Sequence, residues 1–292
     1  MSGLSISTEH LGVRFKDTQA LQDVSVQFDA GAIHGLLGRN GSGKTTLLST
    51  IAALRRPTSG AVLVGGEDPF ENERIMGDIC MIRESGDVLT DEKVRTNLDY
   101  FADVRRYWDA DYAGELLEAF ELSPKKRPDK LSRGQRSALG VVLGLASRSP
   151  VTLFDEVHLG MDAPSRYRFY DLLLADYVEN PRTIVLSSHL ISEIEQLFAG
   201  VTILHSGRVL LNADAEDLRA RGASLTGAAE AITDLTAGLQ VLSTQTLGPT
   251  QQTTVFGDLD PDLRRRAKES GVEIGPVPLQ DLFVHLTSGE NR

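Results

Sequence analysis

A glycine-rich loop at residues 38–45 restricts the possible folds of this chain more than any other feature. It follows the short apolar segment 32–37, which is typical of a strand, and precedes a predicted helix over 46–54. The loop matches the pattern G-x-x-x-x-G-K-T, and its residues are Gly38, Arg39, Asn40, Gly41, Ser42, Gly43, Lys44 and Thr45. Because glycines carry no Cβ, successive backbone N–H groups can turn toward phosphate oxygens. The sequence therefore predicts a nucleotide phosphate site between a strand and a helix.

Individual residues of this loop have expected tasks. Lys44 can reach the β- and γ-phosphates of a nucleotide, and the Thr45 hydroxyl is expected to hold Mg²⁺. Thr46 begins the predicted helix, whose N-terminus directs its positive dipole end at the same phosphates. A glycine-rich turn with a surface lysine is the alternative, but the flanking strand and helix favour the phosphate site.

Two carboxylates follow a second apolar strand at 151–154. Asp155 ends that strand, where it can reach Mg²⁺, and Glu156 is the better candidate to polarise an attacking water. A solvated Asp-Glu pair is the alternative reading of an isolated strand end. His189 follows a further strand at 183–186, and ligands of open α/β sheets bind at the carboxyl ends of strands. His189 could therefore contact the γ-phosphate, although a lone histidine at a strand end is more often structural.

Composition excludes several classes of protein. The chain has 292 residues, of which 41% are hydrophobic and 24% charged, as in a globular protein of one or two domains. Its net charge of −11 disfavours non-specific binding to nucleic acid. The single cysteine, Cys80, allows no internal disulfide and no multi-cysteine zinc site, which fits a reducing compartment. The longest apolar stretch, 138–146, is far shorter than the roughly 20 residues that span a bilayer, so we expect no direct membrane insertion.

The chain divides into regions of different pattern. The first third alternates apolar and polar residues, as strands do, for example at 24–28. Residues from about 91 to 150 have helical spacing, and 201–211 indicates a hairpin. We expect one domain over 1–212 and a small accessory domain over 213–292, with a helix that begins at Pro261 and ends at Gly271.

Between the two phosphate-site motifs lies the segment 131–135, which resembles the LSGGQ signature of the ABC-type ATPases, the nucleotide-binding subunits of ABC transporters. The motifs occur in the order of that family, and the resemblance covers residues 4 to about 215. It implies an α/β fold: a P-loop NTPase (RecA-like) core with an N-terminal antiparallel β-subdomain and an α-helical signature subdomain. The C-terminal residues then form a small α+β extension.

The resemblance also implies a composite site in which ATP and Mg²⁺ are held between two such subunits. One subunit supplies the phosphate loop and the other its signature segment. That segment consists of Leu131, Ser132, Arg133, Gly134 and Gln135. Ser132 and Gly134 would thus act on the ATP of the second subunit, at the N-terminus of a helix expected to begin near Arg136. The resemblance makes Glu156 the catalytic base and His189 the switch histidine.

Two further residues take their expected roles from the family alone. Phe15 stands where the family places an aromatic ring that stacks on adenine, and a core phenylalanine is the alternative. Asp162 lies in the loop that links the two sites of the family's dimers.

The sequence departs from the family pattern at three places. Arg133 replaces a glycine of the signature, and Glu84 takes the place of a glutamine that contacts Mg²⁺ and couples to the membrane subunit. Val157 and His158 replace a Pro-Thr pair after the two carboxylates. None of these changes removes Glu156 or His189, so we expect an active ATPase.

The function implied by the resemblance is to power an ABC-type transporter by ATP-driven dimer closure. Its partners would be transmembrane permease subunits, contacted around residues 84–107, and a second ATPase subunit, at the cytoplasmic face of the membrane. The sequence end at 278–283 resembles that of exporter subunits with separate membrane chains. A soluble ABC-family ATPase and an ATP-binding regulatory subunit with weak turnover remain the alternatives.

Overall fold

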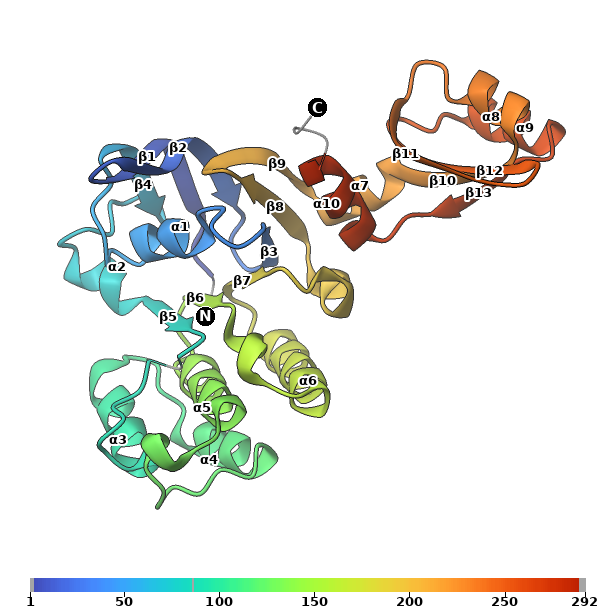
Figure 1. Ribbon diagram of the computed structural model, residues 1–292. Coiled ribbons are helices and arrows are strands. Elements are labelled where there is room, and N and C mark those ends of the chain that lie inside the picture. The colour runs from blue at the N-terminus through green and yellow to red at the C-terminus, as the bar shows by residue number, and fades with distance from the viewer. Residues whose placement is uncertain (1–2, 86, 289–292) are drawn as a thin grey trace. The chain divides into compact units, whose positions relative to one another are not determined.

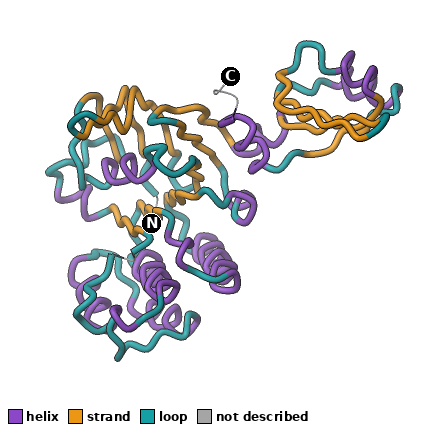
Figure 2. The backbone as a smooth tube through the Cα atoms, in the orientation of Figure 1, coloured by secondary structure: helices purple, strands orange, loops and turns teal. Residues whose placement is uncertain are grey.

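A computed structural model describes residues 3–85 and 87–288 and separates into two compact units (Figures 1 and 2). The first unit runs through His189 and includes Gln196–Asn212. The second begins at Ala213, and the short segment Leu190–Glu195 packs with it rather than with its neighbours in sequence. In this segment the Ser192 amide donates to the Gln280 side chain at 3.1 Å.

An antiparallel sheet begins the first unit. Its strands occur in the order β2-β1-β4 and are β1 (Ile6–Phe15), β2 (Thr18–Phe28) and β4 (Ser59–Val64). In the second half of β2, Val24, Val26 and Phe28 are buried while the residues between them are exposed, as the alternating sequence predicts.

A mostly parallel sheet forms the centre of the same unit. Its strands occur in the order β5-β6-β7-β3-β8-β9. They are β3 (Ile33–Leu37), β5 (Ile79–Arg83), β6 (Val151–Asp155), β7 (Thr183–Ser188), β8 (Gly200–His205) and β9 (Arg208–Asp214). Every residue of β3, β6 and β7 is buried, which is typical of parallel strands covered on both faces. The three strands lie side by side, so their carboxyl ends meet at one edge.

Helices cover this sheet on both faces. Helix α1 (Lys44–Ile51) shares one hydrophobic core with the antiparallel sheet and with β6 and β7. Helices α5 (Arg133–Ala146) and α6 (Ala163–Glu179) pack on β6. A Cβ on Gly144 of α5 would lie 2.5 Å from the Phe154 ring, and that ring packs edge-on against Phe169 of α6, with 5.5 Å between centroids.

The region predicted to be helical consists of α3 (Val94–Val104), α4 (Ala110–Ala119) and α5, drawn in green in Figure 1. The expected start of α5 near Arg136 is wrong, because the helix begins at Arg133. Ser132 caps it: its hydroxyl accepts from the Gln135 amide, and the Gln135 side chain accepts from the Ser132 amide. Such a reciprocal pair satisfies N–H groups that the first helical turn leaves unpaired. A single short helix, α2 (Glu73–Gly77), precedes β5.

A buried ion network joins the helical region to the central sheet. Asp176 of α6 accepts from Arg182 at 2.6 Å and also pairs with Arg148, and all three side chains are nearly inaccessible. Arg148 also contacts Asp109, the residue that caps α4, at 3.1 Å. Burial, together with repulsion from Arg148, lowers the pKa of Arg182 to about 10.

The second unit has its own sheet and core. Its four antiparallel strands occur in the order β11-β12-β10-β13. They are β10 (Gly222–Ala228), β11 (Gln240–Leu247), β12 (Thr250–Phe256) and β13 (Glu273–Pro276), with helices α7 (Ala215–Arg221), α8 (Ala229–Leu235), α9 (Pro261–Glu269) and α10 (Leu279–Ser288). Leu225, Ile232 and Val255 are central to its core. Helix α9 begins at Pro261 and ends two residues before Gly271, close to the predicted bounds, with Asp260 as its cap.

Within the described residues, no helix combines the length and the apolar character that crossing a membrane requires.

Candidate nucleotide site

The glycine-rich loop connects β3 to α1 and has the backbone conformation that its glycines permit. Gly41 and Gly43 have φ of +79° and +107°, in the left-handed region that disfavours residues with a Cβ. A Cβ on Gly38 would lie 2.7 Å from the Leu204 carbonyl oxygen. Gly43 precedes α1, and no side chain caps this helix. The N–H groups of its first turn, including that of Thr46, therefore remain available to an anion.

A cavity of about 800 Å³ opens beside this loop. Its walls include residues 40–46 of the loop and the start of α1, segment 83–85 at the end of β5, the carboxylates at 155–156, and Leu159. This volume suits a nucleotide, since small-molecule sites typically occupy about 300–1,000 Å³. The structure thus brings together Lys44, Thr45, Glu84, Asp155 and Glu156, which the sequence placed on separate segments. Arg39, Asn40 and His189 line an adjoining cavity of about 520 Å³.

Lys44 connects the loop to the second strand. Its ammonium group lies 2.9 Å from a Glu156 carboxylate oxygen and donates to the Gly38 carbonyl at 2.7 Å. The Lys44 side chain is 4% exposed, so its charge is held inside the protein by these oxygens. An incoming phosphate would offer the same kind of oxygen ligand.

The Asp155 carboxylate accepts hydrogen bonds from hydroxyl groups on two other elements. Thr45 donates to one carboxylate oxygen at 2.6 Å, and Ser187 donates to the other at 2.5 Å. Oxygen ligands of this kind suit Mg²⁺, which usually takes one or two carboxylates together with substrate phosphates and water. No cluster of three or more His, Cys, Asp or Glu side chains that could hold a metal is found in residues 3–85 and 87–288. The Thr45–Asp155 pair therefore fits an ion shared with a nucleotide better than a metal held by protein alone.

Glu156 is fixed at the turn that follows β6. It has a φ of +54°, and its backbone N–H donates to the Ser187 hydroxyl at 3.1 Å. His189 Nδ1 lies 3.1 Å from its second carboxylate oxygen. Lys44 and His189 thus contact different oxygens of the Glu156 carboxylate.

The signature segment lies outside the walls of the 800 Å³ cavity. Leu131 is buried, and the Ser132 and Gln135 side chains are engaged in the helix cap. Gly134 packs on the loop after Glu156, where an added Cβ would lie 2.8 Å from the Gly160 carbonyl oxygen. Arg133 pairs with Glu84, so the two unusual residues of the sequence contact each other.

Phe15 and Asp162 lie away from these contacts. Phe15 ends β1, is 38% exposed and carries the Arg55 guanidinium 4.1 Å above its ring, so it is not a core residue. Asp162 caps α6, and hydrogen bonds from Ser165 lower the pKa of its carboxyl. Neither residue lines the nucleotide cavity, and their roles remain predictions.

Sequence reasoning missed Ser187 and the Arg133–Glu84 contact. Ser187 could have been found, because it is a polar residue at the carboxyl end of a buried strand predicted to lie beside the phosphate loop. The contact could not, because its partners are 49 residues apart and belong to separate motifs whose relative placement the sequence does not give.

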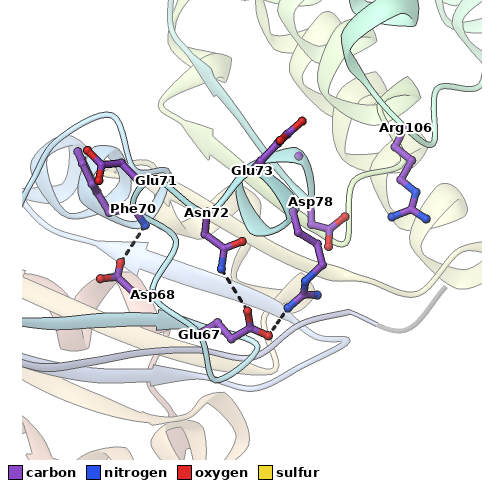
Figure 3. A pocket seen from close by; sticks show the side chains of 10 residues that line it. Glu67, Asp68, Phe70, Glu71, Asn72, Glu73, Asp78 and Arg106 are labelled. Carbon is purple, nitrogen blue, oxygen red and sulfur yellow. Dashed lines mark hydrogen bonds and ion pairs between the residues drawn. The ribbon is translucent and has the colours of Figure 1, made fainter.

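A second cavity, of about 900 Å³, lies between α2 and Arg106, away from the nucleotide cavity (Figure 3). Five carboxylates line it: Glu67, Asp68, Glu71, Glu73 and Asp78. Glu67 contacts Asn72 and Arg74, whereas Asp78 is 8% exposed and has no side-chain partner among the described residues. The cavity is therefore acidic.

Comparison with known proteins identifies the first unit. The model of the ABC transporter family matches residues 21–158, which contain the phosphate loop, the signature segment and both carboxylates. The chain contains an ABC transporter ATP-binding domain. Proteins of this family bind and hydrolyse ATP, and their ATP-binding subunits dimerise and work with transmembrane permease subunits.

Named relatives support this family. The ABC transporter ATP-binding protein YtrB of Bacillus subtilis is 28% identical over 73% of each chain. The daunorubicin resistance ATP-binding protein DrrA3 of Streptomyces coeruleorubidus is 28% identical over 100% of this chain and 98% of its own. The methionine import ATP-binding protein MetN of Bifidobacterium longum is 32% identical over 75% of this chain, which spans only 59% of that relative.

Solved structures share the fold. An ATP-binding subunit of an ABC transporter superposes with a TM-score of 0.67 at 24% identity, over 73% of this chain and 91% of that one. A nucleotide-free ATP-binding cassette gives 0.60 at 18% identity, over 72% and 91% of the two chains. The predicted α/β class with a P-loop NTPase core is therefore confirmed.

Proposed function

We propose that this chain powers a membrane transporter by hydrolysing ATP between two ATP-binding domains. The observation that carries the proposal is the meeting of Lys44, Asp155 and Glu156 at the carboxyl ends of β3, β6 and β7, where the Lys44 ammonium lies 2.9 Å from Glu156. A cation for phosphate, oxygen ligands for Mg²⁺ and a carboxylate for water are the groups that phosphoryl transfer to water requires.

Each group has a part in the proposed reaction. The backbone N–H groups of the loop and Lys44 bind the β- and γ-phosphates, and Thr45 and Asp155 hold Mg²⁺, with Glu84 at the rim of the cavity. The ion, when bound, neutralises phosphate charge and orients the phosphate oxygens. Glu156 orients and polarises the attacking water, and His189 fixes the Glu156 carboxylate. Catalysis thus rests on positioning and charge neutralisation.

Closure of two domains would complete the site. Ser132, Gly134 and Arg133 lie at the N-terminus of α5, which favours an anion, yet they line no wall of their own nucleotide cavity. We propose that they bind the γ-phosphate held by a second ATPase subunit. ATP then favours the closed pair because it binds that state more tightly, and hydrolysis removes the preference. Phe15 would stack on the adenine and Asp162 would lie between the two sites.

The membrane partner would dock on a segment that begins at the rim of the nucleotide cavity. We propose that permease subunits contact residues around 84–107, whose Arg106 borders the acidic cavity of Figure 3. Asp78, which has no side-chain partner in residues 3–85 and 87–288, and its acidic neighbours favour a basic segment of the permease. Such a contact would hold the chain at the cytoplasmic face of the membrane.

Export is the direction we propose for transport. A relative that aligns over the whole of this chain, including the second unit, is a protein of daunorubicin resistance. Removal of a toxic compound from the cell is one way to confer resistance to it, and it is the way open to a transporter. The methionine import relative from Bifidobacterium longum covers 75% of this chain.

Copurification tests the transporter assignment. The tagged chain would be isolated from native membranes in mild detergent, and its companions identified by mass. We expect a polytopic membrane protein, whose recovery falls when Asp78 and Glu73 are replaced by lysine. Recovery of the folded chain without any membrane companion would contradict the transporter assignment and favour a soluble ABC-family ATPase. Uptake of cargo by inside-out vesicles of the complex, dependent on ATP, would support export.

A further inference from the structure

Three consecutive residues at the end of β7 make polar contacts with the end of β6 and the turn that follows it. Ser187 donates to Asp155 at 2.5 Å, Ser188 Oγ lies 3.0 Å from His158 Nε2, and His189 Nδ1 lies 3.1 Å from Glu156. The outer two contacts involve the residues that the proposed function uses. The middle contact involves a histidine that the function has not used.

His158 is an internal side chain. It is 2% exposed and Ser188 is 0% exposed, and the ring of Tyr170 packs beside the imidazole with 6.5 Å between centroids. His158 is not among the residues that line the nucleotide cavity, so any role in hydrolysis would be exerted through its neighbours. Burying an imidazole costs free energy unless its nitrogens are hydrogen-bonded, so the contact with Ser188 holds both residues in place.

The same residue lies in the loop that supports the signature helix. His158 belongs to the short 3-10 turn Val157–Gly160, which directly follows Glu156. A Cβ on Gly160 would lie 2.4 Å from the Ser137 hydroxyl of α5, so the turn and the helix are in close contact. The turn is therefore held by β7 through His158 on one side and by α5 on the other.

We infer that His158 is a positioning residue for ATP hydrolysis, acting through Ser188 to keep His189 in register with Glu156. A small displacement of the end of β7 would lengthen the 3.1 Å contact between His189 and Glu156. The Glu156 carboxylate would then be held by Lys44 alone. Small displacements of reacting groups reduce rates strongly, by up to about 100-fold for about 1 Å. The inference rests on the proposed hydrolysis of ATP.

Four variants test this role in the full-length chain. H158F fills the space but removes the ring nitrogens, whereas H158Q keeps a polar group that can bond to Ser188. S188A removes the partner, and H158F/S188A removes both. The matched control is H34F: His34 is also buried, at 5% exposed, and its Nε2 bonds to the Asp29 carbonyl at 2.9 Å, but it is absent from the nucleotide cavities.

We expect H158F and S188A to lower kcat by about 10- to 100-fold with the ATP affinity within about twofold of wild type. The double variant should lose no more than either single one, since both remove the same contact. H158Q should recover most of kcat, and H34F should lower the melting temperature without changing kcat. Wild-type kcat in H158F, or equal losses in H158F and H158Q, would overturn the inference.

A second measurement separates this inference from the proposed function. If wild type itself hydrolyses no ATP, the proposed function fails. Crystal structures of wild type and H158F then decide the positioning role, which predicts that the His189–Glu156 contact is present in wild type and lengthened in H158F. An unchanged contact in H158F would overturn it.

Discussion

Lys44 and Glu156 are paired, with the lysine ammonium 2.9 Å from the carboxylate, and their side chains are only 4% and 15% exposed. The cation expected to bind phosphate is therefore neutralised by the carboxylate expected to polarise water. In the proposed function, ATP would replace Glu156 at Lys44, and the Glu156 carboxylate would then be free to act on water. The contact would thus couple the binding of ATP to the availability of Glu156 as the base.

The pair predicts opposite effects of two substitutions on ATP affinity. In E156Q, Lys44 loses its charged partner while it stays buried, so a phosphate becomes its best ligand. We expect ATP to bind about tenfold more tightly, which is about 1.4 kcal/mol. K44A should abolish binding. Titration with a fluorescent ATP analogue measures both, and weaker binding by E156Q or micromolar affinity in K44A would contradict the assignment.

Arg133 and Glu84 should affect nucleotide binding more than stability. Both are partly exposed, at 68% and 36%, and exposed ion pairs contribute only about 0–1 kcal/mol. In R133A the Glu84 carboxylate loses its counter-charge at the rim of the cavity and repels ATP, so affinity should fall about threefold. E84Q/R133A should restore it. Equal affinities in R133A and the double variant would rule out this electrostatic role.

Asp176 should be among the residues most important for stability. D176N leaves Arg148 and Arg182 without their shared carboxylate, and breaking a buried pair costs about 3–5 kcal/mol. D171N, on an exposed position of the same helix, is the matched control and should cost less than about 0.5 kcal/mol. Urea unfolding of both variants measures the difference. A loss in D176N as small as that in D171N would show that the network is not stabilising.

Protonation of His34 should lower the free energy of unfolding in mild acid. Burial lowers the pKa of His34 below its ordinary value of 6.5, so the unfolded chain binds a proton that the folded chain does not. This contribution is fully present above pH 6.5 and is lost as the pH falls through 6.5 toward the lower folded value. We expect the free energy of unfolding to decrease more between pH 7.5 and 5.5 in wild type than in H34F. Identical decreases would exclude His34 as the source.

Local patterns predicted much of the fold. The alternation in β2, the apolar strands β6 and β7, and the Pro261 start of α9 follow from periodicity and from helix-start signals, which act over a few residues. The early start of α5 was also encoded, since Ser132 and Gln135 have the spacing of a capping box.

Contacts between distant segments were not predictable in this way. The pairing of Arg133 with Glu84, the contact of His158 with Ser188, and the packing of 190–195 with the second unit depend on how whole elements are arranged. The phosphate loop and the two carboxylates were found because their chemistry requires a fixed local spacing. The residues that support the loop and the carboxylates, such as Ser187 and Ser188, need no fixed spacing from them in the sequence.

The most direct test of the account is phosphate release by the purified chain with ATP and Mg²⁺, compared with E156Q under saturating nucleotide. The account predicts measurable release by wild type and a decrease of about 10²- to 10⁴-fold in E156Q, which still binds ATP. Release by E156Q at the wild-type rate, or a wild-type chain that binds ATP but releases no phosphate, would contradict it.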